Sequence, residues 1–252
     1  MVIATPPMAM TIERSTTAGG LNSNGGERLL TLLQLTNAAF PTGAFTHSYG
    51  FETWIDDGTV NNAAHAERQC LDWLRFNLTT CDAVAAALSY RVTLHHEMSR
   101  IAEIDRQLDA IKLSRESRSA SRMTGAALIA AGRDIFGLSQ ISRLADMMVN
   151  GECEGHHAIV YGVLSVGLGL TERETVTSFL WAGFSSLVGV VQRLVPLGQT
   201  EAQRIIADAG PLIDRCSEIA RMGNLQTMTA SLAALDIASM RHERLHTRLC
   251  IS

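Results

Sequence analysis

A thiol and two imidazoles lie within five residues of one another in the segment GECEGHH, at Cys153, His156 and His157. Nickel and zinc accept thiolate and imidazole ligands, and Glu152 and Glu154 add carboxylates beside them. No CxxC or HxxxH pair completes a four-ligand site nearby, so the segment predicts at most a weak, transient metal contact. The alternative is a loop and the start of a helix whose histidines are incidental.

His47 and Glu52 are a second candidate pair, because they have the residue types of a general base and acid five positions apart. Such pairs are common, and the sequence contains no GxSxG elbow, no GxxxxGK[ST] phosphate loop and no HExxH helix. Gly167 and Gly169 begin a GxG pattern, but no glycine follows at residue 172. We therefore expect no enzymatic activity and no cofactor, with a helical hydrolase based on His47 or Glu52 as the alternative.

The charge balance of the chain argues against large anionic partners. With 21 basic and 25 acidic residues the formal net charge is −4, so we expect binding to neither nucleic acid nor a membrane. The basic residues are arginines apart from Lys112, the only lysine. Five cysteines without a CxxC motif, and an N-terminus without the pattern of a secretory signal, predict a reducing, cytoplasmic location.

The elements that must position these side chains read as helices. Residues 1–26 contain adjacent prolines and a stretch rich in Gly, Ser and Asn, which predicts a mobile tail. After it proline is rare, and apolar residues recur at helical spacing, as at Leu71, Leu74, Leu78 and Cys81. No stretch alternates with period two. We therefore predict an all-α, single-domain bundle of about ten helices over residues 27–231, followed by a C-terminal segment at 232–252.

Several local signals place individual helices. The uncharged run between Glu174 and Arg193 reaches the lower limit for a membrane span, but its Thr, Ser and Gln residues favour a helix buried at the centre of the bundle. Asn61 or Asn62 is the predicted N-cap of the helix that contains Leu71, Leu74, Leu78 and Cys81. Pro211 and Gly223 are predicted to mark the start and the end of another helix.

Three longer segments are more specific than these fragments. The first is LQLTNAAFPTGAFTHSYGFE at residues 33–52, and the second is RLVPLGQ at 193–199, with Gln203 and Arg204 just beyond. The third is LDIASMRHERL at 235–245, with RLCIS at 248–252. In this order they resemble the signatures of the UreF family, urease accessory protein F, from about residue 29 to the end. The departures are Asn37-Ala38 for a Ser/Asp pair, Phe45 for an occasional tyrosine, and Cys250 for a common aromatic residue.

The resemblance implies an all-α fold, a homodimer, and a role in urease maturation without enzymatic activity. In the family, the protein joins UreD (called UreH in some organisms) and the GTPase UreG, and the complex delivers nickel to apo-urease as GTP is hydrolysed. A scaffold in this complex is the first hypothesis. The second is a metallochaperone that itself binds nickel through Cys153, His156 and His157.

The signatures also predict which residues contact the partners. Exposed aromatic and charged side chains on rigid turns suit recognition, although Tyr49 and Glu52 could equally cap and staple their own helix. Arg193 is predicted to contact the GTPase, the alternative being a cap on the carbonyls at its helix end. The predicted partner-binding residues are Phe45, His47, Tyr49, Glu52, Arg193, Gln199, Arg241, His242 and Arg248.

The C-terminal segment from Leu232 onward is predicted to be poorly ordered alone and to fold on UreD. Its few apolar residues are separated by charged ones, which leaves little apolar surface to hold the segment on its own core. A groove on a partner could bury those apolar residues and pair the arginines, as in helix-in-groove recognition. The alternative is a terminal helix that packs on the chain's own bundle.

Overall fold

The computed structural model describes residues 25–246 and 248–250, without the side chain of Phe45. Within them the chain forms eleven helices and no strand, with the continuous run α3, η2 and α4 counted once and the short 3₁₀ helices η1, η3 and η4 not counted. This confirms the predicted all-α, single-domain bundle. The elements are α1 (Gly25–Leu35), η1 (Ala44–Thr46), α2 (Phe51–Asp56), α3 (Ala63–Trp73), η2 (Leu74–Ala83), α4 (Val84–Leu94), η3 (Met98–Arg100), α5 (Ile101–Ile111), α6 (Arg115–Phe136), α7 (Ser139–Val149), α8 (His157–Gly167), α9 (Glu172–Leu194), α10 (Gln199–Asp208), α11 (Gly210–Met222), η4 (Leu225–Thr227) and α12 (Ala233–His242). The predicted mobile tail lies, up to residue 24, outside the described residues.

Local side-chain chemistry sets several helix ends, of which the sequence predicts those at Asn62, Pro211 and Gly223. Asn62 is the N-cap of α3, and its side chain accepts a hydrogen bond from the His65 amide. Pro211 lies in the first turn of α11, which ends at Met222 just before Gly223. Thr171 forms a reciprocal capping box with Glu174 at the start of α9. These caps satisfy helix-end amides without help from the rest of the fold.

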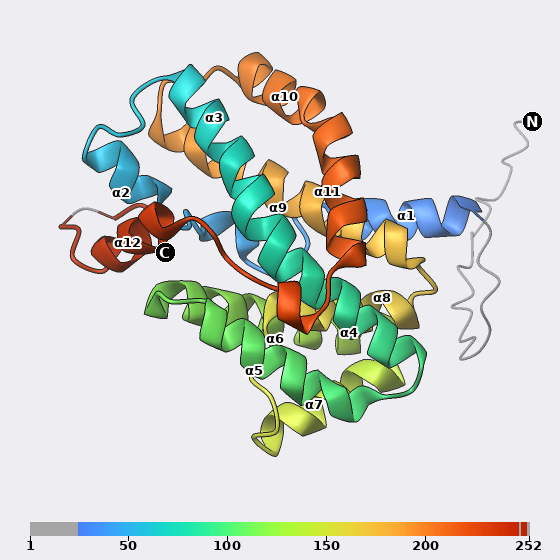
Figure 1. Cartoon of the computed structure of the whole chain (residues 1–252). Helices are drawn as coiled ribbons and strands as arrows, with labels where there is room; N and C mark the ends of the chain where they lie inside the picture. Colours follow the sequence, from blue (N-terminus) through green and yellow to red (C-terminus); the bar gives the residue numbers. More distant parts are fainter. Residues whose placement is uncertain (1–24, 247, 251–252) are drawn as a thin grey trace, which may run out of the picture.

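Three long elements form the centre of the bundle. The continuous helix of α3, η2 and α4 crosses one side of the molecule, and α8 and α9 lie behind it (Figure 1). α8 packs against α4, α6 and α7, and most of its residues are buried. Gly162 permits the close approach of α8 to α4, because a Cβ there would lie 2.4 Å from the carbonyl oxygen of Ala86.

α9 is, within the described residues, the one helix long and apolar enough to cross a membrane. It packs against α4, α10, α11 and η2, and buries Phe184, Leu187 and Val188 among them. This is the environment predicted for a helix at the centre of a bundle. Its last turn carries Arg193, and Val195 is its extended C-cap.

The long helix departs from the prediction at η2, which is π-helical over the ten residues Leu74–Ala83. The spacing of Leu71, Leu74, Leu78 and Cys81 predicts a regular α-helix, and α3 and α4 on either side are regular. Apolar spacing shows which face of a helix is buried. It does not show a local change of hydrogen-bond register, so the π-helical segment was not predicted. Within η2, the Thr79 hydroxyl donates to the carbonyl of Leu74, five residues back.

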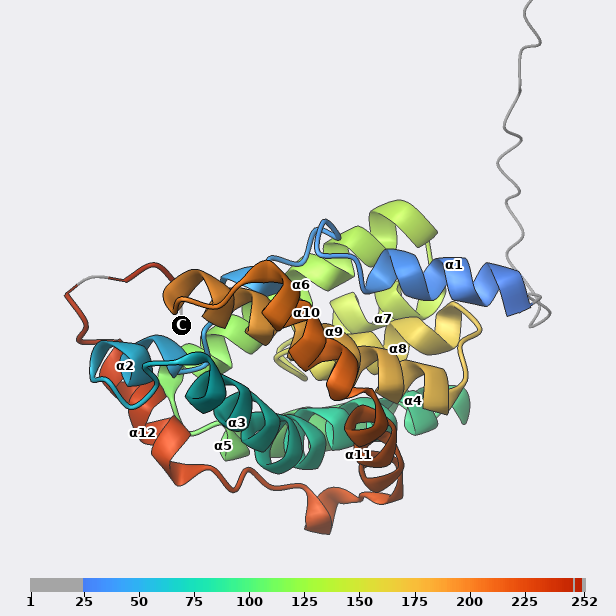
Figure 2. The ribbon, with the colours of Figure 1, turned by 90° about the horizontal axis from the view of Figure 1, so that it is seen from above.

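The C-terminal part of the chain wraps back over the bundle. Residues 223–232, which we call the strap, run from α11 along the outer side of the long helix to α12 (Figure 2). α12 then packs against α2 and α6. The segment predicted to fold on a partner is therefore packed on the chain's own bundle, which is the alternative that the sequence left open. Binding of this segment to UreD stays a prediction.

Candidate functional site

The first signature folds into a turn in which three residues have positive φ. Gly43 and Gly50 have φ of +71° and +93°, and Tyr49 between them has φ of +53°, the left-handed region that non-glycine residues seldom occupy. A Cβ on Gly50 would lie 2.8 Å from the backbone nitrogen of Ser239, so glycine also allows α12 to approach. The strained Tyr49 turns its ring against Trp73, with ring centroids 5.1 Å apart.

This turn forms part of the wall of an internal cavity of about 760 Å³. Further walls come from α1, η2, α6, α8, α9 and α10, and most of the lining is apolar. Exposed Trp181 and Arg193 are among the lining residues, so the cavity reaches the protein surface beside the second signature. A large apolar cavity with few polar groups is the usual form of a binding site.

Several polar side chains line this cavity, and we call four of them the cavity cluster: Tyr49, Asp82, Lys112 and His157. Lys112 Nζ lies 2.8 Å from Asp82 Oδ1, and both side chains are almost completely buried. Burial alone would lower the pKa of Lys112, but the Asp82 carboxylate outweighs it and holds that pKa above its usual value. The Lys112 ammonium is therefore held at the cavity wall by the Asp82 carboxylate.

The other two members of the cavity cluster are uncharged. Burial raises the pKa of Tyr49 to about 12, with Asp82 adding to the effect, so the phenol keeps its proton. Burial lowers the pKa of His157 to about 4. The accessible area of the His157 ring faces the cavity, where it contacts Phe179 at 5.4 Å between centroids. The sequence singles out Tyr49 and His157, and the fold brings them together.

His47 lies beside this cluster and is also neutral. It is buried, its Nε2 is 3.4 Å from the Thr124 hydroxyl, and burial lowers its pKa to about 4. His47 and Glu52 do not form the acid and base pair considered from the sequence, because Glu52 is bonded to the C-terminal segment instead. The alternative of a hydrolase based on these two residues has no support in this geometry.

The GECEGHH segment is held by carboxylates from α5. The buried Asp105 side chain accepts hydrogen bonds from the amides of Glu154, Gly155 and His156, which fixes the start of α8. His156 Nε2 lies 3.1 Å from Asp109 Oδ1. The amide bonds to Asp105 are the structural reason why His156 is buried beside α5 while the next residue faces the cavity.

The three side chains of the metallochaperone hypothesis therefore do not converge. His156 is bonded to Asp109, His157 lines the cavity, and burial raises the pKa of the Cys153 thiol to about 12. Among the described residues no group of three or more His, Cys, Asp or Glu side chains is placed to hold a metal ion. A site with one or two ligands binds metal weakly, so this geometry gives no support to tight nickel carriage.

Glu52 and His242 take part in a network that holds the C-terminus. The Glu52 carboxylate accepts hydrogen bonds from the amides of Leu249 and Cys250 and lies 2.9 Å from His242 Nε2. On its other side, His242 Nδ1 lies 2.7 Å from Glu116 Oε2. Burial would raise the pKa of Glu52, but these amides and His242 outweigh it and lower it. Both residues are buried and bonded within the chain, and a contact of Glu52 or His242 with a partner stays a prediction.

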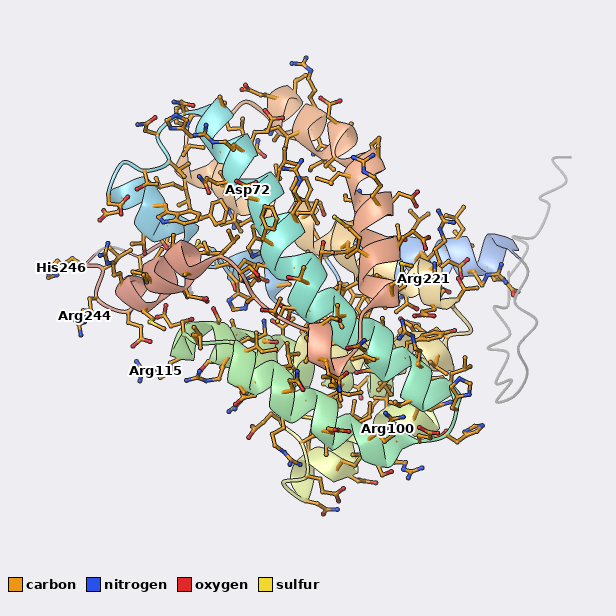
Figure 3. All side chains as sticks on the ribbon, in the orientation of Figure 1. Asp72, Arg100, Arg115, Arg221, Arg244 and His246 are labelled. Carbon is orange, nitrogen blue, oxygen red and sulfur yellow. The ribbon has the colours of Figure 1, made fainter. Side chains whose placement is uncertain are left out.

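Of the other predicted contact residues, His47 is buried, Tyr49 is half-buried, and Arg193, Gln199, Arg241 and Arg248 are exposed. Arg193 and Gln199 flank the turn between α9 and α10, and Arg241 and Arg248 lie at and beyond the end of α12. Arg248 also reaches Glu116, at 3.0 Å. Arg244 and His246 extend from the same edge of the molecule into solvent (Figure 3). The backbone of Phe45 lies in η1, and its side chain is outside the described residues.

The Lys112 and Asp82 pair could hardly be predicted from the sequence. Lys112 stands out as the only lysine, but Asp82 resembles any other acidic residue on a helix. They are 30 positions apart and meet only because α5 folds back along the long helix. A pairing of this kind is visible only after the helices are packed.

The bundle, its surface turns and the cavity define an all-α protein with a candidate binding cavity. A family model described as UreF matches residues 60–210. The urease accessory protein UreF of Lachnoclostridium phytofermentans is 34% identical over 231 residues, which cover 89% of this chain and 98% of that protein. The corresponding proteins of Geobacillus kaustophilus and an Arthrobacter species are 31% and 32% identical over 90% of the chain. The chain belongs to the UreF family of urease accessory proteins.

Proposed function

We propose that this chain is required for the maturation of urease by GTP-dependent insertion of nickel into the apoenzyme. In this role it acts as a scaffold that joins UreD (UreH) and the GTPase UreG on apo-urease, and it is not itself an enzyme. The observation that carries the proposal is the family match, which extends over 89% of the chain and nearly the full length of the relatives. The net charge of −4 fits this role, because the chain has no excess of positive charge that would bind nucleic acid. The cysteines fit it as well, because all five are free thiols, which is usual for cytoplasmic proteins.

Two surfaces of the structure suit protein partners. The turn between α9 and α10 presents Arg193 and Gln199 on a rigid base formed by buried Val195 and Leu197. On α1, Leu29, Leu30 and Leu33 are all more than half exposed, and association of two copies would cover such apolar surface. We propose the turn as a contact for the GTPase, and a homodimer as the form in which the chain works.

The GTPase contact is tested by Arg193→Ala in a co-expression pull-down with UreD and UreG. We expect at least about a tenfold loss of co-purified UreG, the effect of a single strong interface arginine, while UreD binding is retained. The matched control is Arg143→Ala, which removes an exposed arginine from α7, outside the proposed contact. If Arg193→Ala instead lowers the melting temperature strongly, the arginine caps α9 and the contact is wrong.

A further inference from the structure

The π-helical segment η2 is the least regular part of the core and is unusually long. Most π-helical stretches are single turns inserted in an α-helix, and they occur often at functional sites. η2 extends over ten residues in the middle of a continuous helix. A register this uncommon persists only where its surroundings hold it in place, so the contacts of η2 show what maintains it.

On the cavity side, η2 is held by the ion pair of the cavity cluster. Asp82 lies near the end of η2 and accepts hydrogen bonds from Lys112, at 2.8 and 2.9 Å from its two carboxylate oxygens. Asn77 and Leu78 of η2 also line the cavity. The position of η2 about the helix axis therefore decides whether Asp82 reaches the ammonium.

On the outer side, η2 holds the strap. The amides of Thr229 and Ser231 donate to the carbonyls of Thr80 and Phe76, both at 3.0 Å. The Thr80 hydroxyl donates in turn to the carbonyl of Thr229, at 2.7 Å. The strap lies along this part of the long helix in both views (Figures 1 and 2) and leads directly into α12.

We propose that η2 is a register switch that couples the cavity to the strap and, through it, to α12 and the C-terminal segment. In the observed state the π-helical register places Asp82 on Lys112 and the carbonyls of Phe76 and Thr80 under the strap. A change to the regular α-helical register rotates these groups about the helix axis and breaks both sets of contacts together. Because coupling is reciprocal, loosening either side loosens the other.

The coupling has a structural path to the C-terminus. The strap positions the start of α12, and α12 carries His242 to the carboxylates of Glu52 and Glu116. Anything that alters the ion pair in the cavity thereby alters how firmly the C-terminal segment is held. All of these contacts lie within this chain, so the coupling does not depend on the proposed role in urease maturation.

The first test is hydrogen exchange on the full-length chain carrying Asp82→Asn, which keeps the side-chain shape and removes the charge. We expect the amides of Thr229 and Ser231 to exchange at least about tenfold faster, within the usual range of coupling between two sites. The matched control is Ser178→Ala, which removes a hydrogen bond between α9 and the cavity-lining Tyr161 of α8, two residues that lie outside η2. That control is expected to leave both amides unchanged.

The reciprocal test uses Thr80→Val, which removes the hydroxyl bond to the strap. Lys112 is the only lysine, so isotope-labelled lysine gives one side-chain ammonium signal in nuclear magnetic resonance. We expect its protons to exchange with water at least about fivefold faster in Thr80→Val. Thr177→Val, which loses a hydroxyl bond to Ser217 of α11, is the control and is expected to have no effect.

The exchange rates of the α8 amides serve as the reference for global destabilisation, because α8 lies behind the long helix and not under the strap (Figure 1). The double variant Asp82→Asn with Lys112→Met removes both charges, leaves none unpaired, and is expected to show the same acceleration in the strap. The proposal is overturned if Thr229 and Ser231 are unchanged in both cavity variants. It is equally overturned if the exchange of these two amides rises no more than that of the α8 amides. A Lys112 ammonium exchange rate that is unchanged in Thr80→Val would also overturn it.

Discussion

Replacing Lys112 by methionine is expected to lower the free energy of unfolding by about 3–5 kcal/mol, the usual result of removing one partner of a buried ion pair. The Asp82 carboxylate is then left in the cavity wall without its cation, where burial disfavours the charged form. Methionine has a similar length, so the loss reflects charge more than packing. Urea denaturation at pH 7 measures the change.

The matched control for this prediction adds Asp82→Leu to the same chain. With both charges gone, most of the lost stability is expected to return, because replacing a whole buried pair by apolar residues is often close to neutral. A loss of less than about 1 kcal/mol in Lys112→Met, the value of an exposed pair, would contradict the burial argument and mean that cavity water screens the charges.

The protein is also expected to lose stability as the pH falls from 6.5 towards 4. Burial lowers the pKa of His47 and of His157 from the usual 6.5 to about 4. In this window the unfolded chain binds protons that the folded chain does not, so stability is complete above pH 6.5 and declines below it. Each histidine contributes a slope of up to about 1.4 kcal/mol per pH unit, and His156, whose pKa is lowered in the same direction, adds to it.

Denaturation between about pH 7 and 5.5 measures this slope above the range in which most carboxylates titrate. His47→Gln and His157→Gln are each expected to make the pH dependence shallower, whereas His95→Gln, at an exposed site after α4, should leave it as it is. A wild-type stability that stays flat across this range would show that neither buried histidine excludes protons.

The helices were predictable because their signals are local. Apolar spacing marks the buried faces of helices, and caps such as Asn62 and Pro211 depend on residues a few positions away. The π-helical register of η2 was not predictable, because it depends on contacts with Lys112 and with the strap that arise only in the folded chain. Propensity carries no information on such distant partners.

The candidate site was predictable only in part, for a related reason. The signature turn pointed to Tyr49, and the GECEGHH segment pointed to His157, but no sequence pattern places the two residues in one cavity. The rigid turn predicts that Glu52 is exposed, and the charge density after Leu232 predicts that His242 reaches a partner, yet both side chains are buried. Their pairing links positions 190 apart, and that pairing makes their burial stable.

The proposed role in urease maturation is tested most directly by deleting the gene in its host and analysing the urease that remains. A scaffold for nickel insertion is dispensable for making and folding urease, so the enzyme protein should be present at its normal level. We expect that protein to contain little nickel and to be inactive at ordinary nickel concentrations, and a plasmid copy of the gene should restore both. Full urease activity and normal nickel content in the deletion strain would contradict the proposed role.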